Sequence, residues 1–134
     1  MRSLGDVLSH IAGASTFLCS VAAGKQNVAD VLKNPAAFQV EEQKASKADV
    51  IAALKKSRAY CDTVFDSLTD ASGQETVPFF SQDSVSVDSI TLTPTPKLMV
   101  LTSATSHAWE HYGNLVTSMR LKGIVPPSSE RKPQ

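Results

Sequence analysis

The chain alternates between long stretches with a helical spacing of apolar residues and shorter connections rich in polar residues and helix breakers. In three stretches the apolar residues recur three and four positions apart, which is the period of an α-helix packed along one face. These stretches predict long helices over about residues 4–23, 47–69 and 96–122. We therefore expect an all-α fold built on three long helices.

Residues typical of helix ends mark four of these boundaries. Ser3 is suited to N-cap the first helix, and Gly24 and Gly123 are suited to end the first and third helices. Ser46 with Asp49 resembles a capping box at the start of the second helix, with Asp in the place of the usual Glu or Gln. In the polar connection between the two helices, residues 28–33 could form one or two further turns.

Residues 70–94 have a different pattern, in which apolar and polar residues alternate. This pattern is typical of short strands or a hairpin, but a connection of this length can also be a wrapped loop, and the sequence leaves both open. The apolar positions are Val77, Phe79, Phe80, Val85, Val87, Ile90 and Leu92. Thr95 and Pro96 then look like the N-cap and the first residue of the third helix.

Length and composition favour one ordinary globular domain. The 134 residues are 42% hydrophobic and 19% charged, and 13 basic residues balance 13 acidic ones. A neutral chain has no electrostatic footprint for nucleic acid or an anionic membrane, so we expect neither as a partner. We predict a helical-bundle domain over residues 1–125, followed by a polar C-terminal tail over residues 126–134.

Hydropathy and cysteine content bear on location. Every apolar stretch is interrupted before about 18 residues, so we expect no transmembrane helix, and the N-terminus lacks the charge pattern of a signal peptide. These features favour the cytoplasm, although they are compatible with a signal removed earlier. Cys19 and Cys61 lie in amphipathic stretches, which favours buried free thiols; a disulfide between neighbouring helices is the alternative.

The chain has three histidines, and two of them are placed to share a ligand. His107 and His111 are four residues apart, so their side chains project from one helical face with Cβ atoms about 5–6 Å apart. Two imidazoles at this spacing can bind one metal ion. Ser103, Asn114 and Ser118 continue the same polar stripe. A hydrated cavity with a metal explains the stripe, and so does a solvent-exposed face.

The third histidine, His10, lies in the middle of the first predicted helix. Gly13, Ala14 and Phe17 follow it on the same side, and the two small residues leave room for a site between helices. Three histidines from two helices are a common catalytic zinc arrangement, which leaves a coordination position open for water or substrate. We therefore predict a metal site formed by His10, His107 and His111.

Three segments resemble a known family at these residues. Residues 3–12 (SLGDVLSHIA) resemble its first metal-binding helix, and residues 107–116 (HAWEHYGNLV) with 119–127 (MRLKGIVPP) resemble its closing signature. The family is the DinB-like family, related to the YfiT-type metal-dependent hydrolases. The resemblance covers about residues 3–127 and is strongest at both ends.

This resemblance implies an up-down-down-up four-helix bundle with a divalent metal, zinc or nickel, on His10, His107 and His111. Family members include S-transferases that use the low-molecular-weight thiols bacillithiol or mycothiol, and a maleylpyruvate isomerase. Glu110 would be a solvated carboxylate or one that hydrogen-bonds a ligand, while Asn114 and Ser118 would orient a small-molecule substrate.

The family's usual first helix has no counterpart in the chain. We expect the apolar face left open to be covered in a homodimer, or by residues 77–92 folded back over it. The functional prediction is a metal-dependent thiol S-transferase or hydrolase. The alternatives are a non-catalytic, stress-related binding module with a structural metal or none, and a helical scaffold in which the histidines are incidental.

Overall fold

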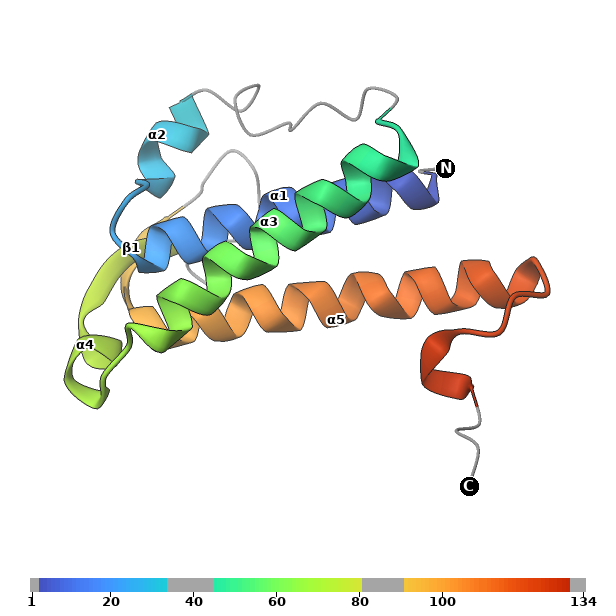
Figure 1. Cartoon of the computed structure of the whole chain (residues 1–134). Coiled ribbons are helices and arrows are strands. Elements are labelled where there is room, and N and C mark those ends of the chain that lie inside the picture. Colours follow the sequence, from blue (N-terminus) through green and yellow to red (C-terminus); the bar gives the residue numbers. More distant parts are fainter. Residues whose placement is uncertain (1–2, 34–44, 81–90, 131–134) are drawn as a thin grey trace.

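A computed structural model describes residues 3–33, 45–80 and 91–130 (Figure 1). It confirms the all-α class, with three long helices: α1 (Leu4–Ala22), α3 (Lys47–Asp66) and α5 (Lys97–Leu121). The shorter elements are α2 (Val28–Lys33), α4 (Asp70–Gln74), β1 (Thr76–Phe80), β2 (Leu92–Pro96) and the 3₁₀ turn η3 (Pro127–Ser129). In Figure 1, α1 and α3 run side by side in the same direction, and α5 runs back along α1 in the opposite direction.

The predicted helix ends are formed by the expected residues at four places. Ser3 and Ser46 each accept the backbone N–H of the Asp three positions on, whose carboxylate accepts the N–H of the capping serine. Gly24 and Gly123 follow α1 and α5 with φ of 69° and 70°. This left-handed conformation is strained for residues with a Cβ, so glycine suits both ends.

Two helix ends differ from their approximate predicted positions by one to three residues. The second long helix ends at Asp66, not near Thr69, because Thr69 instead caps the separate short helix α4 by accepting the Ser72 N–H. The third begins at Lys97, with Pro96 as its N-cap and no side-chain cap. Thr95 lies in β2 and makes no cap.

The segment after α4 forms an ordered hairpin where it is described. Strands β1 and β2 pair antiparallel, with Val77 opposite Thr95 and Phe80 opposite Leu92. The partly buried residues Val77, Phe79, Phe80 and Leu92 pack against the core. The hairpin therefore favours ordered extended structure over a wrapped loop. Its described residues also provide part of the cover that we predicted for residues 77–92. Val85, Val87 and Ile90 lie outside the described residues.

The hydrophobic core gathers at the end of the bundle where α1 ends and α5 begins. Its residues are Phe17, Leu18, Cys19, Val21, Ala22, Val28, Val64, Val100, Leu101 and Ala104. Several predicted apolar positions do not join it, because Ile51, Phe65 and Leu98 remain more than 40% exposed. His10 therefore lies beyond this core, toward the N-terminal end of α1.

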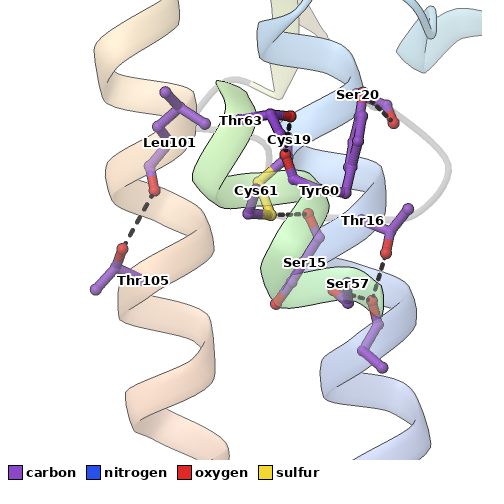
Figure 2. The surroundings of a disulfide bond; sticks show 11 residues. Ser15, Thr16, Cys19, Ser20, Ser57, Tyr60, Cys61, Thr63, Leu101 and Thr105 are labelled. Carbon is purple, nitrogen blue, oxygen red and sulfur yellow. Dashed lines mark hydrogen bonds between the residues drawn. A yellow bond between two sulfur atoms is a disulfide. The ribbon is translucent and has the colours of Figure 1, made fainter. Parts of the chain in front are cut away.

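A disulfide joins α1 to α3. Cys19 and Cys61 are bonded, so the expectation of two free thiols was wrong and the alternative of an interhelical disulfide was right (Figure 2). The periodicity of the two helices could not distinguish buried free thiols from a disulfide, because both arrangements place the cysteines near a helix–helix contact. The bond closes a separation of 42 residues and fixes α1 against α3.

Hydrogen bonds reinforce the same contact. The hydroxyl of Ser57, which is 4% exposed, donates to the carbonyl oxygen of Ala12 at 2.9 Å. Eight residues along α1, the Ser20 hydroxyl donates to the Tyr60 hydroxyl oxygen at 3.2 Å (Figure 2). A side chain that bonds the backbone of a neighbouring helix requires close approach, which small residues permit.

Helix α1 is long and apolar enough to cross a membrane by length and composition, contrary to the expectation of no such segment. Buried core helices and signal sequences share these properties. Here α1 packs against both α3 and α5 and carries the disulfide. Only 33% of its apolar window is buried, so these contacts cover the helix in part.

The predicted boundary between domain and tail falls inside packed structure. Pro126 is among the most deeply buried side chains of the described residues. Arg120 then donates from Nη2 to the Ser129 hydroxyl at 3.1 Å. The first residues of the predicted tail thus lie against the end of α5.

Candidate metal centre

The antiparallel packing of α1 and α5 brings the three histidines together. His10 comes from α1, while His107 and His111 occupy successive turns of α5. Each is half-buried and offers one ring nitrogen, and these three nitrogens all lie within 4.8 Å of one another. The fold thus joins residues from opposite ends of the chain, which sequence spacing alone could not establish.

The three imidazoles meet edge to face. Ring centroids are 4.4 Å apart for His107 and His111, 4.8 Å for His10 and His111, and 5.1 Å for His10 and His107. The interplanar angles are 79°, 86° and 62° in the same order. The rings surround a common centre and do not stack, so their edges can point nitrogens at one atom.

The nitrogen separations can be compared with those around a metal. Two nitrogens bound at about 2.0–2.1 Å to a tetrahedral zinc lie roughly 3.3 Å apart. The Nε2 atoms of His107 and His111 are 3.0 Å apart, close to that value. No pair in the cluster exceeds 4.8 Å, so a modest side-chain rotation would bring the third ring into range.

The same contact restricts protonation. At 3.0 Å one Nε2 must donate an N–H and the other must accept it, so the two imidazoles cannot both carry a proton there. Burial lowers the pKa of His107, and the neighbouring His111 lowers it further, while Glu110 acts in the opposite direction. Neutral imidazole is the form that binds metal, so the surroundings favour the ligand state of His107.

The other ring nitrogen of His107 is unsatisfied. Its Nδ1 is buried and has no hydrogen-bond partner among the described residues. A buried polar atom without a partner costs about 1–3 kcal/mol. If His107 served only for packing, an apolar residue would avoid this cost. The position therefore favours a role in which Nε2 of His107 makes a strong bond.

The three flanking candidates lie at the edge of the cluster. Glu110 and Asn114 are exposed, and Ser118 is half-buried. Glu110 acts on His107 through its charge. Within the part of the chain that the structure describes, no hydrogen bond joins any of the three to His107 or His111. They remain candidates to contact a substrate, and among the described residues the three histidines form the group that could share a metal ion.

Sequence reasoning missed a second feature, a cavity of about 720 Å³ between α1 and α3. Small residues of α1 line it at spacings of four, in the series Ser9, Gly13 and the series Ala12, Thr16, Ser20. That spacing is visible in the sequence and indicates a helix face without bulky side chains. Spacing alone does not show that α3 packs against this face and leaves a cavity.

No protein-family model, curated protein or solved structure matches this chain. The arrangement of the histidines is therefore the principal ground for a functional proposal, and the DinB-like resemblance stays a prediction from the sequence.

Proposed function

We propose that the chain binds one divalent metal ion through His10, His107 and His111. The observation that carries this proposal is the convergence of three ring nitrogens to within 4.8 Å from two helices. The ligands are imidazoles alone, which suits zinc or nickel better than a hard ion such as magnesium or calcium. The low pKa and the orphaned Nδ1 of His107 support the same assignment.

The proposed activity is a metal-dependent transfer or hydrolysis reaction on a small molecule. Three protein ligands leave a coordination position open, and half-buried histidines leave it accessible to solvent. A metal bound there would lower the pKa of a coordinated water or thiol. The DinB-like resemblance favours a low-molecular-weight thiol such as bacillithiol or mycothiol. The two helices hold the imidazoles in place, and Asn114 and Ser118 offer polar groups to orient a substrate.

The alternative is a non-catalytic binding module, and exposed apolar residues on α5 favour it. Trp109 is 67% exposed and Leu98 is 47% exposed. They are eleven residues apart, about three helical turns, and so lie on nearly the same face of α5. A protein partner or a second copy of the chain would cover this face.

The disulfide also bears on where the chain works. Structural disulfides persist in oxidising compartments and are rare in the cytoplasm. The Cys19–Cys61 bond therefore favours an oxidising compartment over the cytoplasmic location expected from the sequence, and in such a compartment hydrolysis is favoured over transfer to a reduced thiol.

Elemental analysis tests the proposal on untagged protein purified without a metal-affinity column. We expect about one zinc or nickel per chain, and a sharp loss of metal in each of His10→Ala, His107→Ala and His111→Ala. Asn114→Ala is the matched control, because it lies on the same stripe of α5 and should keep its metal. Full occupancy in all three histidine variants would reject the site. Metal without thiol-transfer or hydrolytic activity would favour the binding module.

A further inference from the structure

The cavity between α1 and α3 is large enough to hold a small molecule. Its volume of about 720 Å³ falls within the range of about 300–1,000 Å³ that is usual for ligand pockets. Its lining residues belong to one face of α1 and one face of α3, with Gln26 and Ala45 at the edges. None of the three histidines lines it, so the inference is independent of the proposed metal site.

The middle of the cavity is apolar in character. Ala12, Gly13, Val50 and Ala53 line it with little polar surface. The hydroxyls nearby are already engaged, since Thr16 and Ser57 both donate to the carbonyl oxygen of Ala12 at 2.9 Å. The apolar part of a ligand can therefore lie here without breaking either of these hydrogen bonds.

One end of the cavity carries a lysine and a hydroxyl donor. Lys56 and Tyr60 both line it and lie one turn apart on α3. Among the described residues Lys56 makes no ion pair, and the Lys25 ammonium lies 5.6 Å from the centre of the Tyr60 ring. Because Tyr60 accepts the Ser20 hydroxyl, its own O–H remains available to donate into the cavity.

The acidic group at the opposite end does not offset this charge. Asp49 lines the cavity about 10 Å from Lys56 along α3. Its carboxylate accepts the backbone N–H and the hydroxyl of Ser46 as part of the helix cap. These bonds lower the pKa of Asp49, with the Ser46 side chain contributing most. This carboxylate is therefore held in the helix cap, whereas among the described residues neither Lys56 nor Lys25 makes an ion pair.

We propose that this cavity binds a small amphipathic carboxylate. The apolar body lies along Gly13 and Ala53, and the carboxylate accepts hydrogen bonds from Lys56 and Tyr60. From Asp49 to Tyr60 the α3 face is roughly 16 Å long, which suits a chain of medium length. A cationic amphiphile in the same orientation meets the Lys56 ammonium instead, and in the reverse orientation it meets an Asp49 carboxylate already held by two hydrogen bonds from Ser46, so it should bind more weakly.

The test uses the full chain with its disulfide intact and decanoate as the probe, below its micelle concentration. Amide NMR shifts should titrate to saturation with one decanoate per chain and centre on Gly13, Ala53 and Tyr60. Decyltrimethylammonium should bind at least tenfold more weakly. Lys56→Gln should weaken decanoate binding about tenfold, while Lys55→Gln, an exposed neighbour outside the lining, should leave it unchanged.

A filling variant checks the location. Ala53 is exposed at the cavity wall, so Ala53→Phe should keep the fold and its metal content but lose decanoate. Shifts that do not saturate, or that centre on Trp109 of α5, would overturn the proposal. Equal binding of the cationic probe, or equal effects of Lys56→Gln and Lys55→Gln, would also overturn it.

Discussion

The Nε2 atoms of His107 and His111 lie 3.0 Å apart across one turn of α5. Without a metal, the proton on one Nε2 holds this contact, and a proton on the other Nε2 as well would set two N–H donors against each other. A divalent ion would take the place of that proton, which would move to Nδ1 of the same ring, and would satisfy both Nε2 lone pairs at nearly the same separation. Protons and metal therefore compete for the pair, and this competition makes the site testable without knowledge of a substrate.

Metal occupancy should fall with acidification. The folded-state pKa of His107 is lowered, first by burial and then by the charge of His111. Its neutral state therefore persists somewhat below the ordinary histidine pKa of about 6.5. We expect full metal occupancy at pH 7 and progressive release below about pH 6, measured by dialysis and elemental analysis. Occupancy unchanged down to about pH 4 would indicate carboxylate ligands instead.

The same pKa shift makes the metal-free protein less stable in acid. A group whose pKa is lower in the folded state favours folding above its unfolded-state pKa, and this contribution is lost as the pH falls through the folded-state value. The free energy of unfolding of the metal-free chain should therefore decrease as the pH falls below about 6.5. In His107→Met this part of the pH dependence should disappear. An unchanged pH profile in the variant would assign the acid sensitivity to other groups.

Replacing His107 should stabilise the metal-free protein while destroying the site. Its buried Nδ1 has no partner among the described residues, and methionine fills a similar volume without a polar atom. Because the substitution also removes the hydrogen bond to His111, we expect His107→Met to raise the free energy of unfolding by no more than about 1 kcal/mol in the presence of a chelator. Excess zinc should reverse the order, because only the wild type is stabilised by binding. A variant that is less stable than the wild type in chelator would mean that His107 is a packing residue.

The long helices and the histidines of the candidate site could be named from the sequence, whereas the contacts around them could not. Capping at Ser3 and Ser46 and the glycines at 24 and 123 are local effects, and they were predicted correctly. The three histidines were named from their spacing and from a family resemblance. Their convergence depends on the packing of α1 against α5, which is a tertiary property.

The predictions that were wrong also depend on tertiary packing. Thr69 suits either the end of one helix or the N-cap of the next, and in the structure it is the N-cap of α4. Ile51 and Phe65 keep a helical spacing, yet α3 turns its small residues, including Ser57, toward α1 instead. Nothing in the sequence shows that the His107 Nδ1 is left without a partner, because that requires the positions of all its neighbours.

The disulfide should contribute substantially to stability. Cross-linking a separation of 42 residues lowers the entropy of the unfolded chain by an amount worth about 4 kcal/mol in the simplest model. The double variant Cys19→Ser/Cys61→Ser should therefore lower the free energy of unfolding by about 2–4 kcal/mol, measured by urea denaturation. Adding a reductant should destabilise the wild type similarly and leave the double variant unchanged. A wild type that is insensitive to reductant would contradict a structural role for the bond.

The exposed face of α5 should mediate self-association. Trp109 is 67% exposed and packs edge to face on Tyr112, with ring centroids 5.8 Å apart. We expect light scattering at micromolar concentration to show a homodimer, and Trp109→Lys to shift it to monomer. Lys122→Ala, a change at another exposed position near the end of the same helix, should leave the dimer intact. A wild-type monomer that also resists proteolysis between residues 75 and 92 would favour the hairpin as sufficient cover.

The most direct test of the central claim is X-ray absorption at the zinc edge, on untagged protein loaded with one equivalent of zinc. The account predicts three imidazole nitrogens at about 2.0–2.1 Å and one exchangeable oxygen ligand from water. His10→Ala should reduce the imidazole count to two, which tests the one ligand supplied by α1. A spectrum with one imidazole or none, or an unchanged imidazole count in His10→Ala, would contradict the three-histidine site.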